Sequence, residues 1–91
     1  LLRMIITITA LNGDTYNIFI DSIEYLSSTV RDEEDVHYNK YKNNREPPIY
    51  RSVEVFTIVT TLLSIEVAEE EYNRILKLWK NYDITGTHQE A

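Results

Sequence analysis

The feature that most limits the fold is a short turn-forming stretch, Leu11-Asn12-Gly13, between two β-prone runs. Residues 4–11 are rich in Ile and Thr, and residues 15–20 add the aromatic side chains Tyr16 and Phe19 to Ile and Thr. β-Branched and aromatic side chains favour strands, and an Asn-Gly pair between two such runs is typical of a hairpin. The sequence therefore predicts a β-hairpin at the start of the chain.

The length of the hairpin loop decides which side chains face a core. A two-residue loop would pair Ile8 with Asn17 and would leave both faces mixed. A three-residue loop, Leu11 to Gly13, instead gathers the apolar side chains on one face: Met4, Ile6, Ile8, Tyr16, Ile18 and Ile20. The opposite face then holds Thr7, Thr9, Thr15 and Asn17. Since a one-residue slip moves every side chain to the other face, burial favours the three-residue loop, with Gly13 at the left-handed bulge position.

Three further strands are expected downstream of the hairpin. Residues 21–31 open with a possible helical turn and then indicate a strand over much of 24–30. Residues 51–67 are β-prone but too long for one ordinary strand. We expect two strands there, joined near Thr60-Thr61 by a tight turn or a sharp bend.

Residues 68–82 carry the spacing of an amphipathic helix. Apolar side chains recur every three to four positions at Tyr72, Ile75, Leu76, Trp79 and Tyr82. The acidic side chains of 69–71 near the start and the lysines 77 and 80 further along suit the helix dipole. The spacing also suggests an ion pair between residues 70 and 74.

Together these elements predict an α+β fold. A small curved antiparallel sheet or open barrel of about five strands would pack under one C-terminal helix. Residues 1–83 would form a single domain with an inserted loop or arm at 32–50, because that segment ends in Pro47-Pro48 and breaks the strand pattern. Residues 84–91 would form a flexible tail.

Composition narrows the class of function. The formal net charge is −6, which argues against direct binding of duplex nucleic acid and is compatible with a basic, nucleic-acid-binding protein partner. The chain has no cysteine, which fits a cytoplasmic protein, and no apolar run of membrane-spanning length. We expect a soluble, cytoplasmic protein that forms homo-oligomers, since a chain this short buries a modest core.

No motif in the sequence predicts catalysis, a cofactor or a metal site. Two glycines are too few for a typical phosphate-binding loop. His37 and His88 stand alone in polar segments. The acidic run 32–35 lacks the spaced oxygen ligands and central Gly of a calcium loop. We therefore expect a protein that is not an enzyme.

The insertion is the best candidate for a partner-binding or nucleotide-binding site. It interleaves aromatic and cationic side chains in an otherwise acidic chain: Tyr38, Lys40, Tyr41, Lys42, Arg45, Tyr50 and Arg51. Tyr and Arg are favoured at protein interfaces, and they also stack on bases and bind phosphates. The alternative is that the tyrosines pack on the domain and the cations balance nearby acids.

Two segments carry a resemblance to a known family. Leu11-Asn12-Gly13 followed by Ile23-Glu24-Tyr25 resembles the opening of the small FlbD-type flagellar or swarming motility proteins, and residues 64–76 are similar to that family's closing strand and helix. The resemblance implies a small sheet plus helix and no catalytic residues. The segment 32–50 has no counterpart in the family, and the family's second Gly turn would fall at Thr60-Thr61, where this chain has no Gly.

Two functions follow as hypotheses. The first is a small non-catalytic binding protein that self-associates, through the Thr-rich hairpin face or an unpaired sheet edge, and contacts a partner with the insertion. The alternative is a phage- or mobile-element-encoded inhibitor of a bacterial defence system. It would act as an acidic mimic of nucleic acid or sequester a nucleotide signal between subunits.

Overall fold

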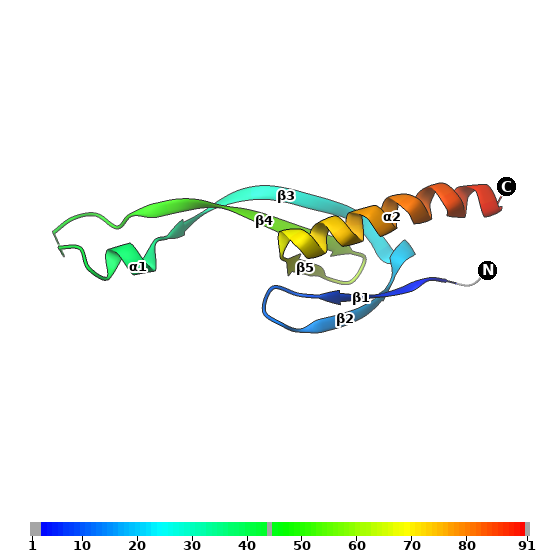
Figure 1. The fold of residues 1–91 in the computed structure, drawn as a ribbon, viewed down its shortest axis with the longest axis horizontal. Coiled ribbons are helices and arrows are strands. Elements are labelled where there is room, and N and C mark those ends of the chain that lie inside the picture. Colours follow the sequence, from blue (N-terminus) through cyan, green and yellow to red (C-terminus); the bar gives the residue numbers. More distant parts are fainter. Residues whose placement is uncertain (1–2, 44, 91) are drawn as a thin grey trace.

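The protein is an elongated α+β molecule of five strands and a long C-terminal helix. The computed structural model describes residues 3–43 and 45–90, and it places side chains as far as residue 82. The molecule measures 65 × 21 × 21 Å (Figure 1). Its elements in chain order are β1 (Ile5–Thr9), β2 (Thr15–Phe19), the 3-10 turn η1 (Ile20–Ser22), β3 (Ile23–Glu34), α1 (Val36–Asn39), β4 (Tyr50–Thr60), β5 (Ser64–Val67) and α2 (Glu69–Glu90).

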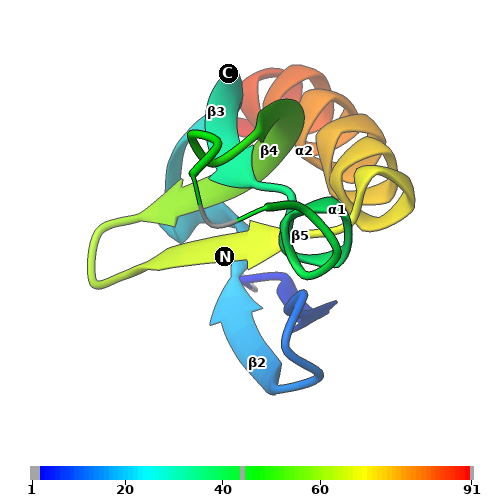
Figure 2. The ribbon, with the colours of Figure 1, turned by 90° about the vertical axis from the view of Figure 1, so that its left-hand side faces the viewer.

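The strands form two open antiparallel sheets, β1-β2 and β3-β4-β5. The expected fold class is thus confirmed, with the detail that the hairpin stands as a sheet of its own. The β1–β2 hairpin and α2 both pack against the three-stranded sheet, with β1 next to the helix and β2 on the side of β1 away from it (Figure 2). In the part of the chain that the structure describes, no helix is both long enough and apolar enough to cross a membrane.

The hairpin has the three-residue loop that burial favours. Ile8 lies opposite Tyr16 and Thr7 opposite Asn17. The Ala10 N–H donates to the Asp14 carbonyl at 2.7 Å, which closes the loop. Gly13 has φ +94°, a left-handed value that side chains disfavour. The predicted register and the role of Gly13 are both confirmed.

The predicted division of residues 51–67 into two strands is also confirmed. β4 and β5 are joined at Thr60, whose hydroxyl accepts from the Leu63 N–H at 3.1 Å and donates to the Leu63 carbonyl at 2.9 Å. Thr60 is the buried polar residue of the core, and these bonds satisfy its hydroxyl. No non-Gly residue within 3–43 or 45–90 has a positive φ, so this turn needs no glycine.

Three element bounds differ from the sequence prediction. β3 continues through Asp32, Glu33 and Glu34, because each pairs with a residue of β4 as far as Tyr50. The acidic run is therefore partly strand. Within the inserted segment, residues 36–39 form the short helix α1. α2 begins one residue later than predicted and ends at Glu90; the expected flexible tail at 84–91 lies beyond the residues whose side chains are described.

The core lies where the hairpin, the three-stranded sheet and α2 meet. Its buried members are Ile6, Ile8, Ile20, Ile23, Ile58, Ile65, Val67 and Ile75, with Tyr16, Ile18, Phe56, Tyr72 and Trp79 among the partly buried side chains packed on them. The inward face predicted for the hairpin is confirmed, except that Met4 is 40% exposed. On α2, Leu78 packs on this core in addition to the predicted aromatic side chains.

An ion pair on α2 holds the helix against β1. The guanidinium of Arg74 lies 2.6 Å from a carboxylate oxygen of Glu71 and donates to the Thr7 carbonyl at 2.6 Å, while Glu71 accepts from the Thr9 N–H at 2.8 Å. The predicted pair of Arg74 with Glu70 is wrong, because the free edge of β1 draws Arg74 to the side of the helix where Glu71 lies. Arg74 lowers the pKa of the Glu71 carboxyl, although partial burial acts in the opposite direction.

Candidate partner-binding site

The long hairpin of β3 and β4 carries the candidate site away from the core. The two strands stay in register from Tyr25 opposite Val59 to Glu34 opposite Tyr50. Only the base of this hairpin contributes to the core, through Ile23, Leu26, Phe56 and Ile58. Beyond that base the paired strands project as an arm (Figure 1), which we define as residues 30–54, with its tip at residues 35–51.

Two short side chains fold the tip. Asp35 caps α1, its carboxylate accepting from the Tyr38 N–H at 3.0 Å. The amide of Asn39 bonds to the returning chain in both senses. Its Nδ2 donates to the Ile49 carbonyl at 3.0 Å, and its Oδ1 accepts from the Ile49 N–H at 2.8 Å. Asn39 therefore closes the tip much as a pair of strand hydrogen bonds would.

The tyrosines of the tip are turned to solvent. Tyr38 is 53% exposed, Tyr41 74% and Tyr50 60%. Tyr41 meets the ring of His37 edge-on at 5.6 Å, and the Lys40 ammonium lies 5.8 Å from the Tyr41 ring centroid. The alternative in which the tyrosines pack on the domain does not describe this structure.

The cations of the tip have no carboxylate partner among the side chains that the structure places. Arg3, Arg31 and Arg74, which lie outside the tip, all pair with carboxylates, at 2.7, 2.7 and 2.6 Å. Among the side chains that the structure places, no ion pair involves Lys40, Lys42, Arg45 or Arg51, nor Lys77 or Lys80 on α2. The Lys42 ammonium donates instead to the Glu46 carbonyl. Lys40, Arg45 and Arg51 are exposed.

The neighbouring acidic run is occupied by other contacts. The carboxylate of Asp32 accepts from the Ser52 hydroxyl, and that of Glu33 pairs with Arg31. Glu34 accepts from the Asn39 amide, and Asp35 caps α1. Within the described residues, no group of three or more His, Asp or Glu side chains is placed to hold a metal ion. The acidic run thus shapes the arm and does not balance the tip's cations.

The predicted site residues are gathered only in part. A shallow cavity of about 450 Å³ at the tip is lined by Tyr38, Tyr41 and Lys42, together with His37, Asn43 and Glu46. Lys40, Arg45, Tyr50 and Arg51 lie on the same tip but outside this cavity. The sequence did not point to Asn39, because its role depends on hydrogen bonds with Ile49, ten residues later in the chain. It also did not point to Asn43 and Glu46 as cavity residues, because nothing in their spacing distinguishes them.

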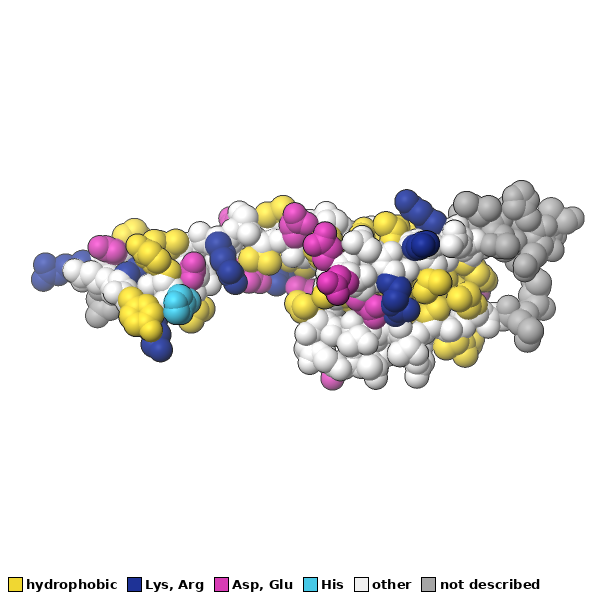
Figure 3. Space-filling model, in the orientation of Figure 1, with side chains coloured by type: hydrophobic (Ala, Val, Ile, Leu, Met, Phe, Trp, Pro, Cys, Tyr) yellow, Lys and Arg dark blue, Asp and Glu magenta, His cyan; other side chains and the backbone are white. Residues whose placement is uncertain are grey.

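Charge is separated along the molecule. Residues 36–51 hold four Lys and Arg side chains and one Glu, a formal charge of +3 against −6 for the whole chain, so the remaining residues carry −9. Figure 3 shows Lys and Arg side chains at the end of the arm, and acidic side chains gathered over the start of α2 and the adjoining strands. A cationic tip on an acidic body is suited to directional contact with an anionic surface.

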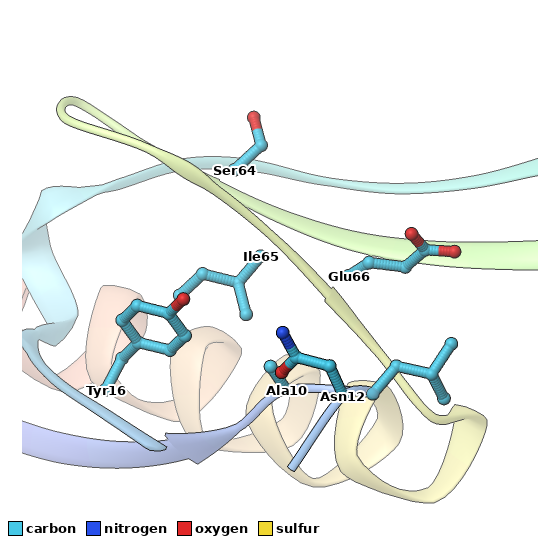
Figure 4. Close-up of a pocket in the computed structure, with 7 residues that line it drawn as sticks. Ala10, Asn12, Tyr16, Ser64, Ile65 and Glu66 are labelled. Carbon is cyan, nitrogen blue, oxygen red and sulfur yellow. The ribbon is translucent and has the colours of Figure 1, made fainter. Parts of the chain in front are cut away.

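A second cavity lies between the β1–β2 loop and β5. It has about 450 Å³ and is lined by Ala10, Leu11, Asn12, Tyr16, Ser64, Ile65 and Glu66. Tyr16 and Asn12 reach toward Ile65 (Figure 4). The carboxylate in its lining, Glu66, accepts from Arg31 at 3.1 Å. Among the described residues this cavity brings together no acid–base pair of the kind that proton-transfer catalysis requires.

Comparison with models of protein families, with curated proteins and with solved structures finds no match to this chain. The similarity to FlbD-type proteins therefore stays a prediction from the residues that carry it.

Proposed function

We propose that this chain is a small, non-catalytic binding protein that contacts an anionic protein surface with the tip of its arm. One observation carries the proposal: among the placed side chains, the exposed Arg45 and Arg51 of the tip have no carboxylate partner, whereas Arg3, Arg31 and Arg74 each have one. An exposed guanidinium without an internal partner is free to bind a carboxylate of another protein. Exposed tyrosines beside them supply apolar contact area, which charges alone do not.

The arm suits this role because it separates recognition from folding. The tip lies beyond the buried residues, so its side chains can bind a partner without changing the packing of the core. The partner would meet Tyr38, Tyr41 and the surrounding cations at the end of a narrow hairpin. A concave or grooved acidic surface fits such a shape better than a flat one.

A matched pair of double variants tests the proposal. Lys40→Glu with Arg45→Glu reverses two exposed tip cations, and Lys77→Glu with Lys80→Glu reverses two exposed cations of α2. Both variants have the same net charge. Tagged wild type and both variants would be expressed in the native host, and the recovered proteins would be compared by quantitative mass spectrometry.

We expect the tip variant to lose its specific partner by about tenfold or more, and the α2 variant to keep it. Equal recovery by all three proteins would show that the tip is not the contact. Circular dichroism of the purified variants would establish that each remains folded.

The acidic body supports a second candidate, the block of a basic, nucleic-acid-binding protein by presented carboxylates. The charge of −9 outside residues 36–51 is the observation that favours it. Glu69 and Glu70 are exposed at the start of α2 and form no ion pair among the placed side chains. In the same capture experiment this candidate predicts loss of the partner with Glu69→Lys and Glu70→Lys, and retention with the tip variant. An origin in a phage or mobile element would fit this second candidate.

We also infer a cytoplasmic location. A chain without cysteine can form no disulfide, so its folding does not depend on an oxidising compartment. Fractionation of the native host, with the tagged chain followed by immunoblot, tests this inference.

A further inference from the structure

The free edges of the two sheets differ sharply in how they are protected. An edge strand presents unpaired N–H and C=O groups that bind another strand unless something blocks them. On β1, Arg74 and Glu71 of α2 occupy the Thr7 carbonyl and the Thr9 N–H. On β5, the Glu66 carbonyl accepts from the Leu11 N–H at 2.8 Å. These two edges are already engaged within the chain.

The outer edge of β3 is protected by charge. Five of its 12 residues have acidic or basic side chains: Glu24, Arg31, Asp32, Glu33 and Glu34. Charged side chains on an edge strand make pairing with another copy unfavourable. β3 is therefore a poor site for edge-to-edge contact at Glu24 and along 31–34, and its register with β4 is irregular between Ile23 and Tyr25; residues 25–30 are uncharged.

The outer edge of β2 has no such protection. Its sequence, TYNIF, contains no charge and no proline, and its pairing with β1 has no bulge. The bonds from Ala10 N–H to Asp14 carbonyl and from Ile20 N–H to Met4 carbonyl show that even-numbered residues of β2 bond to β1. The backbone groups of Thr15, Asn17 and Phe19 therefore point outward.

These outward groups are largely unoccupied. In the described part of the chain, the Phe19 carbonyl accepts from the Ser22 hydroxyl, and no hydrogen bond involves the backbone groups of Thr15 or Asn17 that point away from β1. The strand lies on the side of the molecule away from α2 (Figure 2), so the helix does not cover it.

An apolar groove runs beside this edge. It has about 570 Å³ and lies between β2 and the β4–β5 turn, lined by Arg3, Ile5, Ile18, Phe19, Leu62 and Leu63 among others. Ile5 is 60% exposed and Leu62 89% exposed, although both are large aliphatic side chains. Exposed apolar side chains grouped beside an open strand edge mark an interaction surface.

We propose that two copies of the chain associate through their β2 edges, antiparallel about a two-fold axis, to form one continuous sheet β1-β2-β2-β1. Asn17 would lie opposite Asn17 of the partner subunit, and Thr15 opposite the partner's Phe19. Each of these facing pairs can exchange backbone hydrogen bonds. The apolar side chains of the groove, Leu62 among them, would be covered by the second copy.

The uncharged sequence of β2 favours a second copy as the occupant. A two-fold axis at Asn17 sets β2 against itself, so the two copies meet there without opposing like charges, even though a net charge of −6 makes the chains repel overall. β2 runs along the long axis of the molecule (Figure 1), so a two-fold axis across it sends the two arms toward opposite ends. The cationic tips would then be held far apart.

Sedimentation of two single variants from about 1 µM to about 1 mM tests this interface. Asn17→Lys sets two like charges opposite each other at the two-fold axis. Thr7→Lys is the matched control. It adds the same charge on the same exposed face, and it removes the same Thr7-to-Asn17 side-chain hydrogen bond, yet it lies on the strand whose edge α2 occupies. We expect wild type and Thr7→Lys to dimerise alike, and Asn17→Lys to dissociate with a Kd about tenfold higher or more.

Amide hydrogen exchange of the wild type gives an independent readout. The amides of Thr15, Asn17 and Phe19 should become protected as the protein concentration rises through the dimer Kd. A wild type that stays monomeric at about 1 mM would overturn the proposal. This holds even if the β2 edge pairs with a strand of a different protein, because the proposal names a second copy of this chain. A dimer in which these three amides exchange equally fast at low and high concentration would also overturn the proposal. Neither result bears on the tip, which lies at the far end of the arm.

Discussion

At the scale of single residues, a few side chains and one glycine determine how whole elements fold or pack. Gly13 supplies the one left-handed backbone that the structure shows among its described residues. Glu71 and Arg74 supply the polar partners that β1 lacks on its outer side. Both features join local chemistry to the packing of a whole element.

Substitution of Gly13 should cost stability through the backbone alone. A Cβ built at Gly13 meets nothing within 4 Å, so there is space for a side chain but not a favourable φ. We expect Gly13→Ala to lower the free energy of unfolding by about 1–2 kcal/mol, with Gly13→Asn milder and Gly13→Val more severe. Urea denaturation of the three variants would establish this order. Equal losses for Asn and Val would contradict the backbone explanation.

The Glu71–Arg74 pair should make stability depend on acid. The pKa of Glu71 is lowered in the folded protein, mainly by the hydrogen bond from Arg74, so its contribution is present at neutral pH and is lost as the pH falls through that lowered value. We expect Glu71→Gln to be about 1 kcal/mol less stable than wild type at pH 7. The difference should shrink as the pH falls below about 4. Thermal melts from pH 7 to pH 3 measure this difference in stability. Glu70→Gln leaves the Glu71–Arg74 pair intact and should follow the wild-type profile.

At the scale of elements, each strand and helix has one face assigned to the core and another to solvent. The even-numbered positions Leu26, Phe56 and Ile58 of β3 and β4 face the core, while Val55 is buried on the opposite face of the sheet. Among the placed side chains of α2 the fully buried one is Ile75, flanked by Tyr72 and Trp79.

The rotation of α2 about its axis can be tested by two neighbouring substitutions. Ile75 is 0% exposed, whereas Leu76 is only partly buried. We expect Ile75→Ala to cost about 3 kcal/mol, because it leaves a cavity in the core, and Leu76→Ala to cost clearly less. Both changes introduce the same helix former, so helix propensity has little effect on the comparison. Chemical denaturation that ranks Leu76→Ala as the costlier change would place the other face of the helix in the core.

The tip of the arm should open without unfolding the body. Asn39 makes hydrogen bonds to both backbone groups of Ile49 and to Glu34, each worth about 1 kcal/mol. We expect Asn39→Ala to raise amide exchange across α1 and at Ile49, while the melting temperature of the body changes little. A large fall in melting temperature would instead show that tip and core unfold together.

At the scale of the whole molecule, the chain is far from a sphere. Its radius of gyration is 18.0 Å. A compact domain of this length would have about 12 Å. The arm and the long helix extend in opposite directions from a small core (Figure 1). This shape gives one short chain two separate surfaces, the tip and the β2 edge.

Removal of the outer arm should leave the body folded. Arg31 lies opposite Val53, so a two-residue Asn-Gly turn can replace residues 32–52 and reconnect the strands. We expect this shortened chain to keep a cooperative melt within about 5 °C of wild type, because the core lies outside the deleted segment. Small-angle X-ray scattering, compared at matched oligomeric state, should show a radius of gyration several Å smaller. Loss of cooperative unfolding would show that the arm takes part in the core.

The sequence by itself determined the local structure of the body. Alternation of apolar residues set the hairpin register, because only one loop length puts Ile6, Ile8 and Ile18 on a common face. A three-to-four spacing of apolar residues predicted α2 to within one residue of its start, and a lapse in the alternation predicted the break at Thr60-Thr61. These are short-range properties, fixed by side-chain period and by the φ that Gly alone adopts freely.

Only the tertiary structure decided what those residues meet. Arg74 pairs with Glu71 and not with Glu70 because the edge of β1 lies on that side of the helix. The acidic run became strand and cap because β4 returns beside it, and among the placed side chains it forms no ion pair with the tip's cations. The same assembly covers the edge of β1 and leaves that of β2 open. Contacts between residues distant in the chain depend on how elements pack, and the spacing within a single element carries no record of them.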